Sequence, residues 1–192
     1  MSAVGILGGT FDPVHLGHLI TAQAVKEIRN LEKIIFIPAY ISPHKTDRIS
    51  APEIHRLKML QMVVEDVPYF EFSDIELKAK SISYTVNTLL EFKKNYNDLE
   101  LIIGYDNILN FNTWKDPDKI IELAKLIVLR RRTNDEKAEK DKYYKAAQIV
   151  KTPVIEISSS EIRNRIKEGK PIDFFVPKKI KEYIHKFNLY KE

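Results

Sequence analysis

The sequence predicts an α/β protein with a doubly wound, mostly parallel β-sheet. Short runs rich in apolar and β-branched residues recur along the chain, and most intervals between them carry apolar residues at helix spacing. Strands that alternate with helices imply right-handed crossovers and a parallel sheet covered on both faces. Ligands bind such sheets at the carboxyl ends of the strands, so the loops after the strands are the candidate functional segments.

The predicted strands are these apolar runs. In chain order they are Val4 to Leu7, Lys33 to Pro38, Tyr69 to Asp74, Leu99 to Gly104, Lys125 to Arg130 and Pro153 to Ile157. The loops that follow the carboxyl ends of these strands, where ligands are expected to bind, are Gly8 to His18, Tyr40 to Thr46, Ile75 to Thr85, Gly104 to Trp114 and Ser158 to Arg163.

The predicted helices fill the intervals between the strands. The first begins between Asp12 and Leu16 and continues to about Asn30. A second helix follows Pro52, with Ile54, Leu57, Leu60 and Val64 at helix spacing. A third follows Ser83 to Thr85, with Val86, Leu89, Leu90 and Phe92 as its apolar residues. A fourth begins at Asp116-Pro117 and continues through Ala124. Residues from about Arg132 to Ala147 form either a charged helix or a loop, and Pro177 starts a C-terminal helix with Ile180, Tyr183, Ile184 and Phe187.

Length and composition narrow the class of protein. With 192 residues and 44% hydrophobic content, the chain is long enough for one well-buried domain, expected over residues 1–192, with 158–192 as a C-terminal helical part. The absence of cysteine excludes disulfides, cysteine nucleophiles and thiolate metal sites. No long apolar run or signal-like start is present, so we expect a cytoplasmic protein without a membrane partner.

The first loop, GGTFDPVHLGH, is the stretch around which the sequence is organised. Gly8 and Gly9 lack Cβ atoms, which permits a sharp turn and a close approach to a ligand, and Thr10 adds a hydroxyl donor. Asp12 and Pro13 resemble an N-cap and a first helical residue. The N–H groups and positive dipole end of the following helix therefore predict an anion site in this loop.

His15 and His18 are three residues apart, so near a helix start they lie on one face, and Gly17 between them keeps the surface low. Two imidazoles beside free backbone N–H groups can hydrogen-bond phosphoryl oxygens and stabilise charge during transfer. A metal-binding pair and two solvated side chains are the alternatives. Their charge state does not follow from the sequence, because the helix dipole disfavours protonation and a bound polyphosphate favours it.

Further candidate ligand-binding residues lie in the other loops. After the second strand, Lys45 of the Pro43-His44-Lys45 segment offers a flexible cation for phosphate. After the fourth strand, Gly104 permits close approach and Asp106 can accept from a ribose hydroxyl. Trp114 can stack on a flat ring, although the alternative is a core residue.

The last loop, Ile157 to Arg163, reads ISSSEIR and predicts a second helix N-terminus. Its serines, Ser158 among them, can cap the helix or bind phosphate. Arg163 lies one turn further and offers a planar fork suited to phosphate oxygens, with a surface ion pair as the alternative.

These motifs carry a resemblance to a known family. GTFDPVHLGH resembles the T/HxGH signature of the nucleotidylyltransferase superfamily, whose members transfer a nucleotidyl group and release pyrophosphate. Together with PHK at 43–45, SYT at 83–85, GYD at 104–106, ISSSEIR and the closing FVPKKIKEYI, the chain resembles the bacterial nicotinate-nucleotide adenylyltransferases over nearly its whole length. The resemblance implies a Rossmann-like nucleotidylyltransferase fold.

The resemblance also implies a reaction: ATP and nicotinate mononucleotide give deamido-NAD and pyrophosphate, with Mg²⁺. Because no carboxylate cluster in the sequence looks like a dedicated Mg²⁺ site, we expect the ATP phosphates to carry the metal. The implied catalytic residues are His15, His18, Lys45 and Arg163. The implied ATP-binding residues are Gly8, Thr10, Phe11, His15, His18, Ser158 and Arg163. To these, the properties of the loops add Gly9, Gly104 and Asp106 as expected ATP-binding residues. The implied nicotinate mononucleotide contacts are Lys45, Tyr84, Thr85 and Trp114.

One departure from the family pattern is present, and two alternatives remain. Ser160 stands where many relatives have Thr, which keeps the hydroxyl, and His15 stands where the shorter pantetheine-phosphate adenylyltransferases usually have Thr, which argues against that family. The alternatives are an enzyme that uses nicotinamide mononucleotide and a noncatalytic nucleotide-sensing or RNA-binding module. The intact HxGH argues against the module, and no RNA-recognition signature is present, so no nucleic acid partner is expected. A homo-oligomer stays open, because the sequence does not determine oligomeric state.

Overall fold

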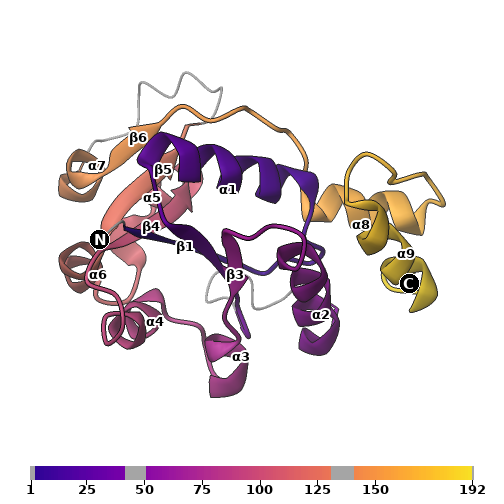
Figure 1. The fold of residues 1–192 in the computed structure, drawn as a ribbon, viewed down its shortest axis with the longest axis horizontal. Helices are drawn as coiled ribbons and strands as arrows, with labels where there is room; N and C mark the ends of the chain where they lie inside the picture. Colours follow the sequence, from indigo (N-terminus) through magenta and orange to yellow (C-terminus); the bar gives the residue numbers. More distant parts are fainter. Residues whose placement is uncertain (1–2, 42–50, 131–140, 192) are drawn as a thin grey trace.

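The computed structural model describes residues 3–41, 51–130 and 141–191. Its sheet has the strand order β3-β2-β1-β4-β5-β6, and every pairing in it is parallel. Figure 1 shows the twisted sheet with helices on both faces and with α8 and α9 at one end. The doubly wound α/β fold expected from the alternating pattern is therefore confirmed.

Most strands follow the apolar runs closely. Their bounds are β1 Val4–Gly9, β2 Lys33–Pro38, β3 Phe70–Phe72, β4 Leu99–Gly104, β5 Lys125–Leu129 and β6 Gln148–Val150. The strand expected at Pro153 to Ile157 is wrong, because the segment that pairs with β5 is Gln148–Val150. Residues 151–157 instead run as irregular chain from this edge to the C-terminal helices, and Val154 stays 46% exposed.

The longer helices also begin near the predicted positions. Their bounds are α1 Leu16–Arg29, α2 Glu53–Val64, α4 Thr85–Phe92, α6 Pro117–Leu123, α8 Ser159–Lys167 and α9 Lys178–Lys186. Short helical turns that were not predicted from the sequence are α3 Ile75–Ala79, α5 Tyr105–Leu109 and η1 Phe111–Thr113. A further short helix, α7 Lys142–Ala146, lies in the stretch 132–147, for which a charged helix and a loop were both expected. Of the charged stretch 132–147, residues 132–140 lie outside the described part of the chain.

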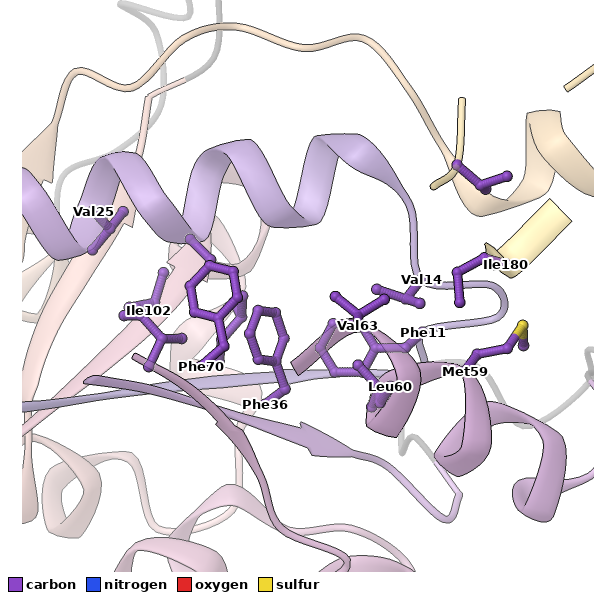
Figure 2. Close-up of a cluster of buried hydrophobic side chains, with 14 of the residues drawn as sticks. Phe11, Val14, Val25, Phe36, Met59, Leu60, Val63, Phe70, Ile102 and Ile180 are labelled. Carbon is purple, nitrogen blue, oxygen red and sulfur yellow. The ribbon is translucent and has the colours of Figure 1, made fainter. Parts of the chain in front are cut away.

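The strands divide their side chains between two cores, as the period of two in a strand requires. In β2, Ile34 and Phe36 face the core beneath α1, α2 and α9, whereas Ile35 and Ile37 face the core beneath α4 and α6. Figure 2 shows the first core, with Phe36 and Phe70 from the sheet lying against side chains of α1 and α2. Phe11 and Val14, from the loop after β1, lie in this same core.

Within the described residues, no helix is long and apolar enough to cross a membrane.

Candidate active site

The loop between β1 and α1 lies at the carboxyl end of the sheet. Gly8 and Gly9 belong to β1 itself and pair with Ile37 and Pro38. A Cβ atom at Gly8 would meet no atom within 4 Å, so the backbone there is open to a ligand. A Cβ atom at Gly9 would lie 3.0 Å from the Phe11 ring, so the second glycine makes room for that ring.

Phe11 turns the chain from the strand toward the helix. It has a φ of 49°, a conformation that non-glycine residues rarely adopt and that costs on the order of 1–3 kcal/mol. Its buried ring offsets this cost by packing edge-on against His18 and Phe36, with ring centroids 5.0 and 5.7 Å away. The Phe11 side chain is thus part of the core.

The start of α1 differs from the expected one. The N-cap is His15 and not Asp12, because the Asp12 carboxylate is buried and accepts hydrogen bonds from Ala51 N and the Tyr190 hydroxyl. His15 Nδ1 accepts from His18 N, and His18 Nδ1 accepts from His15 N, each at 3.3 Å. The two histidines thus form a reciprocal capping box, with stacked rings whose centroids lie 3.6 Å apart.

This capping box determines which nitrogen carries the proton in each neutral ring. Because Nδ1 accepts a backbone hydrogen bond in both rings, the proton of the neutral form lies on Nε2. Burial lowers the pKa of His15 from 6.5 to about 4, so this ring is neutral at pH 7. At pH 7 His15 therefore offers an N–H donor at Nε2 without carrying a charge.

We expect this burial to make stability depend on pH. The folded state disfavours protonated His15, so the stabilisation is complete above pH 6.5 and is lost as pH falls toward about 4. The loss amounts to about 3 kcal/mol. Urea unfolding at pH 7.5 and 4.5 should show it relative to His15→Asn, which keeps an N-cap acceptor but does not titrate. Parallel pH profiles for the two proteins would contradict this expectation.

Gly17 provides space for the same imidazole. A Cβ atom there would lie 3.0 Å from His15 Nδ1 and 3.1 Å from Cε1. Alanine normally stabilises a helix interior by about 1 kcal/mol relative to glycine. We instead expect Gly17→Ala to lower stability by about 1–2 kcal/mol and to displace the His15 ring. Gly8→Ala, whose Cβ meets open space, serves as the control in urea unfolding; equal stabilities of the two variants would contradict this role of Gly17.

The N-terminus of α8 packs against the same loop. Ser158 caps the helix by accepting from Glu161 N, and the Ser159 hydroxyl donates to Pro13 O over 3.0 Å. Arg163 Nη1 donates to Asp12 O over 2.7 Å and lies 3.5 Å from Asp12 Oδ2. Arg163 Nη2 also donates to the Ser160 hydroxyl. The structure thus places the two helix starts, α1 and α8, side by side, although Ser158 to Arg163 follows irregular chain and not the strand from which this loop was selected.

Arg56, on α2, holds the loop between β1 and α1 through hydrogen bonds to backbone carbonyls. This buried guanidinium donates to the carbonyl oxygens of Thr10, Ala39 and Ala51. Burial lowers its pKa, while Asp12 raises it. Arg56 was not predicted as a site residue, although Arg56, Met59, Leu60 and Val63 form the buried stripe of α2 at helix spacing. The stripe predicted from Ile54 is wrong at its first position, because Ile54 is 65% exposed.

A cleft of about 260 Å³ opens beside this loop at the carboxyl ends of β1 and β4. The cleft is lined by seven of the predicted ligand-binding residues: Gly8, Gly9, Thr10, Tyr84, Thr85, Gly104 and Trp114. Trp114 is half-buried and packs against Phe111, with ring centroids 5.0 Å apart, so it belongs to both the core and the cleft wall. Lys115 also lines the cleft, and its Nζ lies 4.5 Å from the centre of the Tyr84 ring.

Other predicted residues lie elsewhere. His15, His18, Ser158 and Arg163 lie beyond Thr10, at the two helix starts, and are not among the cleft-lining residues. Asp106 is exposed in the first turn of α5, whereas its neighbour Asn107 lines the cleft. Lys45 and the rest of the PHK motif lie outside the described residues.

One acidic group in the cleft was not predicted from the sequence. The Glu76 carboxylate accepts from the Thr88 hydroxyl over 2.6 Å, and burial raises its pKa. Glu76 lies in the Ile75 to Thr85 loop selected from the sequence, but no motif distinguishes this residue within α3, a single short turn. Across residues 3–41, 51–130 and 141–191, no group of three or more His, Asp or Glu side chains is arranged to hold a metal ion.

Comparison with solved structures shows the same fold. Nicotinic acid mononucleotide adenylyltransferase of Plasmodium falciparum, complexed with NaAD, superposes with a TM-score of 0.78 at 20% identity, covering 99% of this chain and 98% of that chain. A putative nicotinate-nucleotide adenylyltransferase from Vibrio parahaemolyticus superposes with a TM-score of 0.73, also at 20% identity, over 100% and 97% of the two chains.

Sequence comparison identifies the family. The cytidylyltransferase-like family model matches residues 6–165. "Probable nicotinate-nucleotide adenylyltransferase" of Caldicellulosiruptor saccharolyticus is 39% identical over 98% of this chain and 99% of its own length. The protein of the same name from Clostridium novyi is 38% identical over the full length of both. The chain therefore belongs to the cytidylyltransferase-like family and, within it, to the nicotinate-nucleotide adenylyltransferases.

Proposed function

We propose that this protein transfers the adenylyl group of ATP to nicotinate mononucleotide, giving deamido-NAD and pyrophosphate in NAD biosynthesis. The observation that carries the proposal is the placement of two helix N-termini, with His15, His18 and Arg163, next to a cleft lined by Trp114 and Tyr84. The first group suits a polyphosphate and the second suits a flat ring. The full-length relatives named for this reaction support the same assignment.

The reaction needs no protein nucleophile. A 5′-phosphate oxygen of the mononucleotide attacks the α-phosphorus of ATP, a new P–O bond forms, and the bond from the α-phosphorus to the bridging oxygen breaks to release pyrophosphate. The protein therefore contributes positioning and charge stabilisation. His15 and His18 donate from Nε2 to phosphoryl oxygens, and the N–H groups at the starts of α1 and α8 add fixed positive potential.

The remaining roles follow from charge and shape. Arg163 neutralises ATP phosphate oxygens, and Lys45 neutralises the phosphate of the mononucleotide. ATP lies against Gly8, Gly9, Thr10, the Phe11 backbone, Ser158 and Gly104, and its ribose donates a hydrogen bond to Asp106. The pyridine nucleotide is held by Tyr84, Thr85 and Trp114. Mg²⁺ enters with ATP, bound by its phosphates, and supplies further charge neutralisation there.

The positive charge of Lys115 favours the carboxylate of nicotinate mononucleotide over the amide of nicotinamide mononucleotide. Among the described residues that line the cleft it is the one Lys or Arg, and it lies over the Tyr84 ring. We expect Lys115→Met to lower kcat/KM for nicotinate mononucleotide about three- to tenfold, with little effect on nicotinamide mononucleotide. Lys119→Met, an exposed lysine paired with Glu122 outside the cleft, is the matched control. An equal loss with both acceptors would contradict this role.

Product analysis tests the function directly. With ATP labelled at the α-phosphate, nicotinate mononucleotide and Mg²⁺, the label should appear in the dinucleotide product and never on the protein. Label retained on the denatured protein, or found only in AMP, would contradict direct transfer.

A further inference from the structure

The C-terminal segment contacts the phosphate-binding loop through one side chain. After α9, Asn188 adopts a φ of 50°, and the N–H groups of Asn188 and Leu189 donate to the carbonyls of His185 and Ile184. This pattern is a Schellman motif, in which a left-handed residue ends the helix and redirects the chain. It directs Leu189 and Tyr190 back onto the first core.

There the Tyr190 hydroxyl donates to Asp12 Oδ1 over 2.8 Å. Asp12 is 3% exposed, and a buried carboxylate needs donors to offset the loss of its hydration. The same Oδ1 atom accepts from Ala51 N over 3.0 Å. Burial and the charge of Asp12 both raise the pKa of the Tyr190 phenol, so the phenol stays protonated and remains a donor.

Asp12 is also the residue that holds Arg163. Its carbonyl oxygen accepts from Arg163 Nη1, and its other carboxylate oxygen lies 3.5 Å from the same nitrogen. Asp12 lies three residues before His15, in the same loop. A displaced Asp12 would therefore move the guanidinium and the start of α1 together.

We propose that Tyr190 is a positioning residue for ATP, which fixes Asp12 and through it Arg163 and the phosphate-binding loop. The proposal rests on the function proposed above and adds a residue that lies outside both the HxGH and the ISSSEIR motifs. It predicts that deleting one hydroxyl near the C-terminus changes binding of ATP and not of the acceptor.

The test compares Tyr190→Phe with Tyr183→Phe. Both remove one phenolic hydroxyl from the C-terminal region, but the Tyr183 hydroxyl bonds His55 Nδ1 on α2 and not Asp12. In a calorimetric titration with ATP and Mg²⁺ alone, we expect Tyr190→Phe to raise the Kd about tenfold, because the arrangement of Asp12 and Arg163 that binds ATP becomes less populated in the free protein. Tyr183→Phe should stay within about twofold of the unmodified protein, since no loop contact is lost.

Steady-state kinetics separates positioning from general destabilisation. Tyr190→Phe should raise KM for ATP while KM for nicotinate mononucleotide stays within about twofold. In an Arg163→Ala background, Tyr190→Phe should lower kcat/KM for ATP by less than it does in the unmodified protein, because part of its effect passes through Arg163.

Three results would overturn the proposal: an unchanged Kd in Tyr190→Phe, an equal change in Tyr183→Phe, or a full additional loss in the Arg163→Ala background. The titration uses ATP without acceptor, so it decides this proposal even if nicotinate mononucleotide is not turned over. An unmodified protein that binds no ATP would overturn both proposals together.

Discussion

His18→Ala should lower kcat/KM roughly 10³-fold while the protein still folds. The substitution removes an Nε2–H donor proposed to act on the transferring phosphoryl group, in a site where loss of one such donor typically costs roughly 10²–10³-fold. It also removes the acceptor for His15 N and the ring stacked on His15. The proper comparison is therefore a variant that keeps the cap.

His18→Gln is that variant, because glutamine at the third helical position can accept from the N-cap N–H in the same way. We expect His18→Gln to recover the stability lost in His18→Ala, as measured by urea unfolding, while turnover stays at least about 100-fold below normal. Turnover near that of the unmodified enzyme in either variant would remove His18 from the mechanism.

Arg163→Ala should lower kcat/KM for ATP about 10²- to 10³-fold. The substitution removes the phosphate ligand proposed at the start of α8, together with the bonds from Arg163 to Asp12 O and the Ser160 hydroxyl. Arg163→Lys keeps the charge but lacks the planar fork, so we expect it to recover less than about a tenth of the lost activity.

Arg165→Ala is a control on the same helix. Arg165 donates to Pro171 O and packs on the Phe175 ring, so its loss should affect stability and leave ATP kinetics within about twofold. If Arg163→Lys were fully active, or if Arg165→Ala lost as much activity, bidentate phosphate binding by Arg163 would be the wrong interpretation.

The fold was largely predictable because its strands are buried on both faces. Continuous apolar runs such as Ile34 to Ile37 have this cause, and each predicted strand except the last overlaps an observed strand. Pro153 to Ile157 has the same composition but pairs with no strand in the described part of the chain, and β6 is the less apolar Gln148–Val150. Pairing at a sheet edge depends on tertiary position, which local composition does not encode.

Parts of the candidate site's local structure were predictable because their causes lie in short stretches of sequence. Glycines, histidines and serines at the starts of helices have local causes, so the β1–α1 loop and the Ser158 cap could be found from spacing alone. The N-cap was misassigned to Asp12 because its carboxylate bonds Tyr190, 178 residues away. Arg56 holds carbonyls from three separate segments, and such long-range contacts leave no short motif.

The most direct test of adenylyl transfer to nicotinate mononucleotide is pyrophosphate release with ATP and Mg²⁺. Release is measured with nicotinate mononucleotide, nicotinamide mononucleotide and phosphopantetheine at equal concentration. We predict strong preference for nicotinate mononucleotide, with the amide second and phosphopantetheine inactive. Release with phosphopantetheine alone would contradict the assigned substrate. The absence of release with every acceptor would contradict adenylyl transfer itself and favour a nucleotide-binding module that keeps the fold.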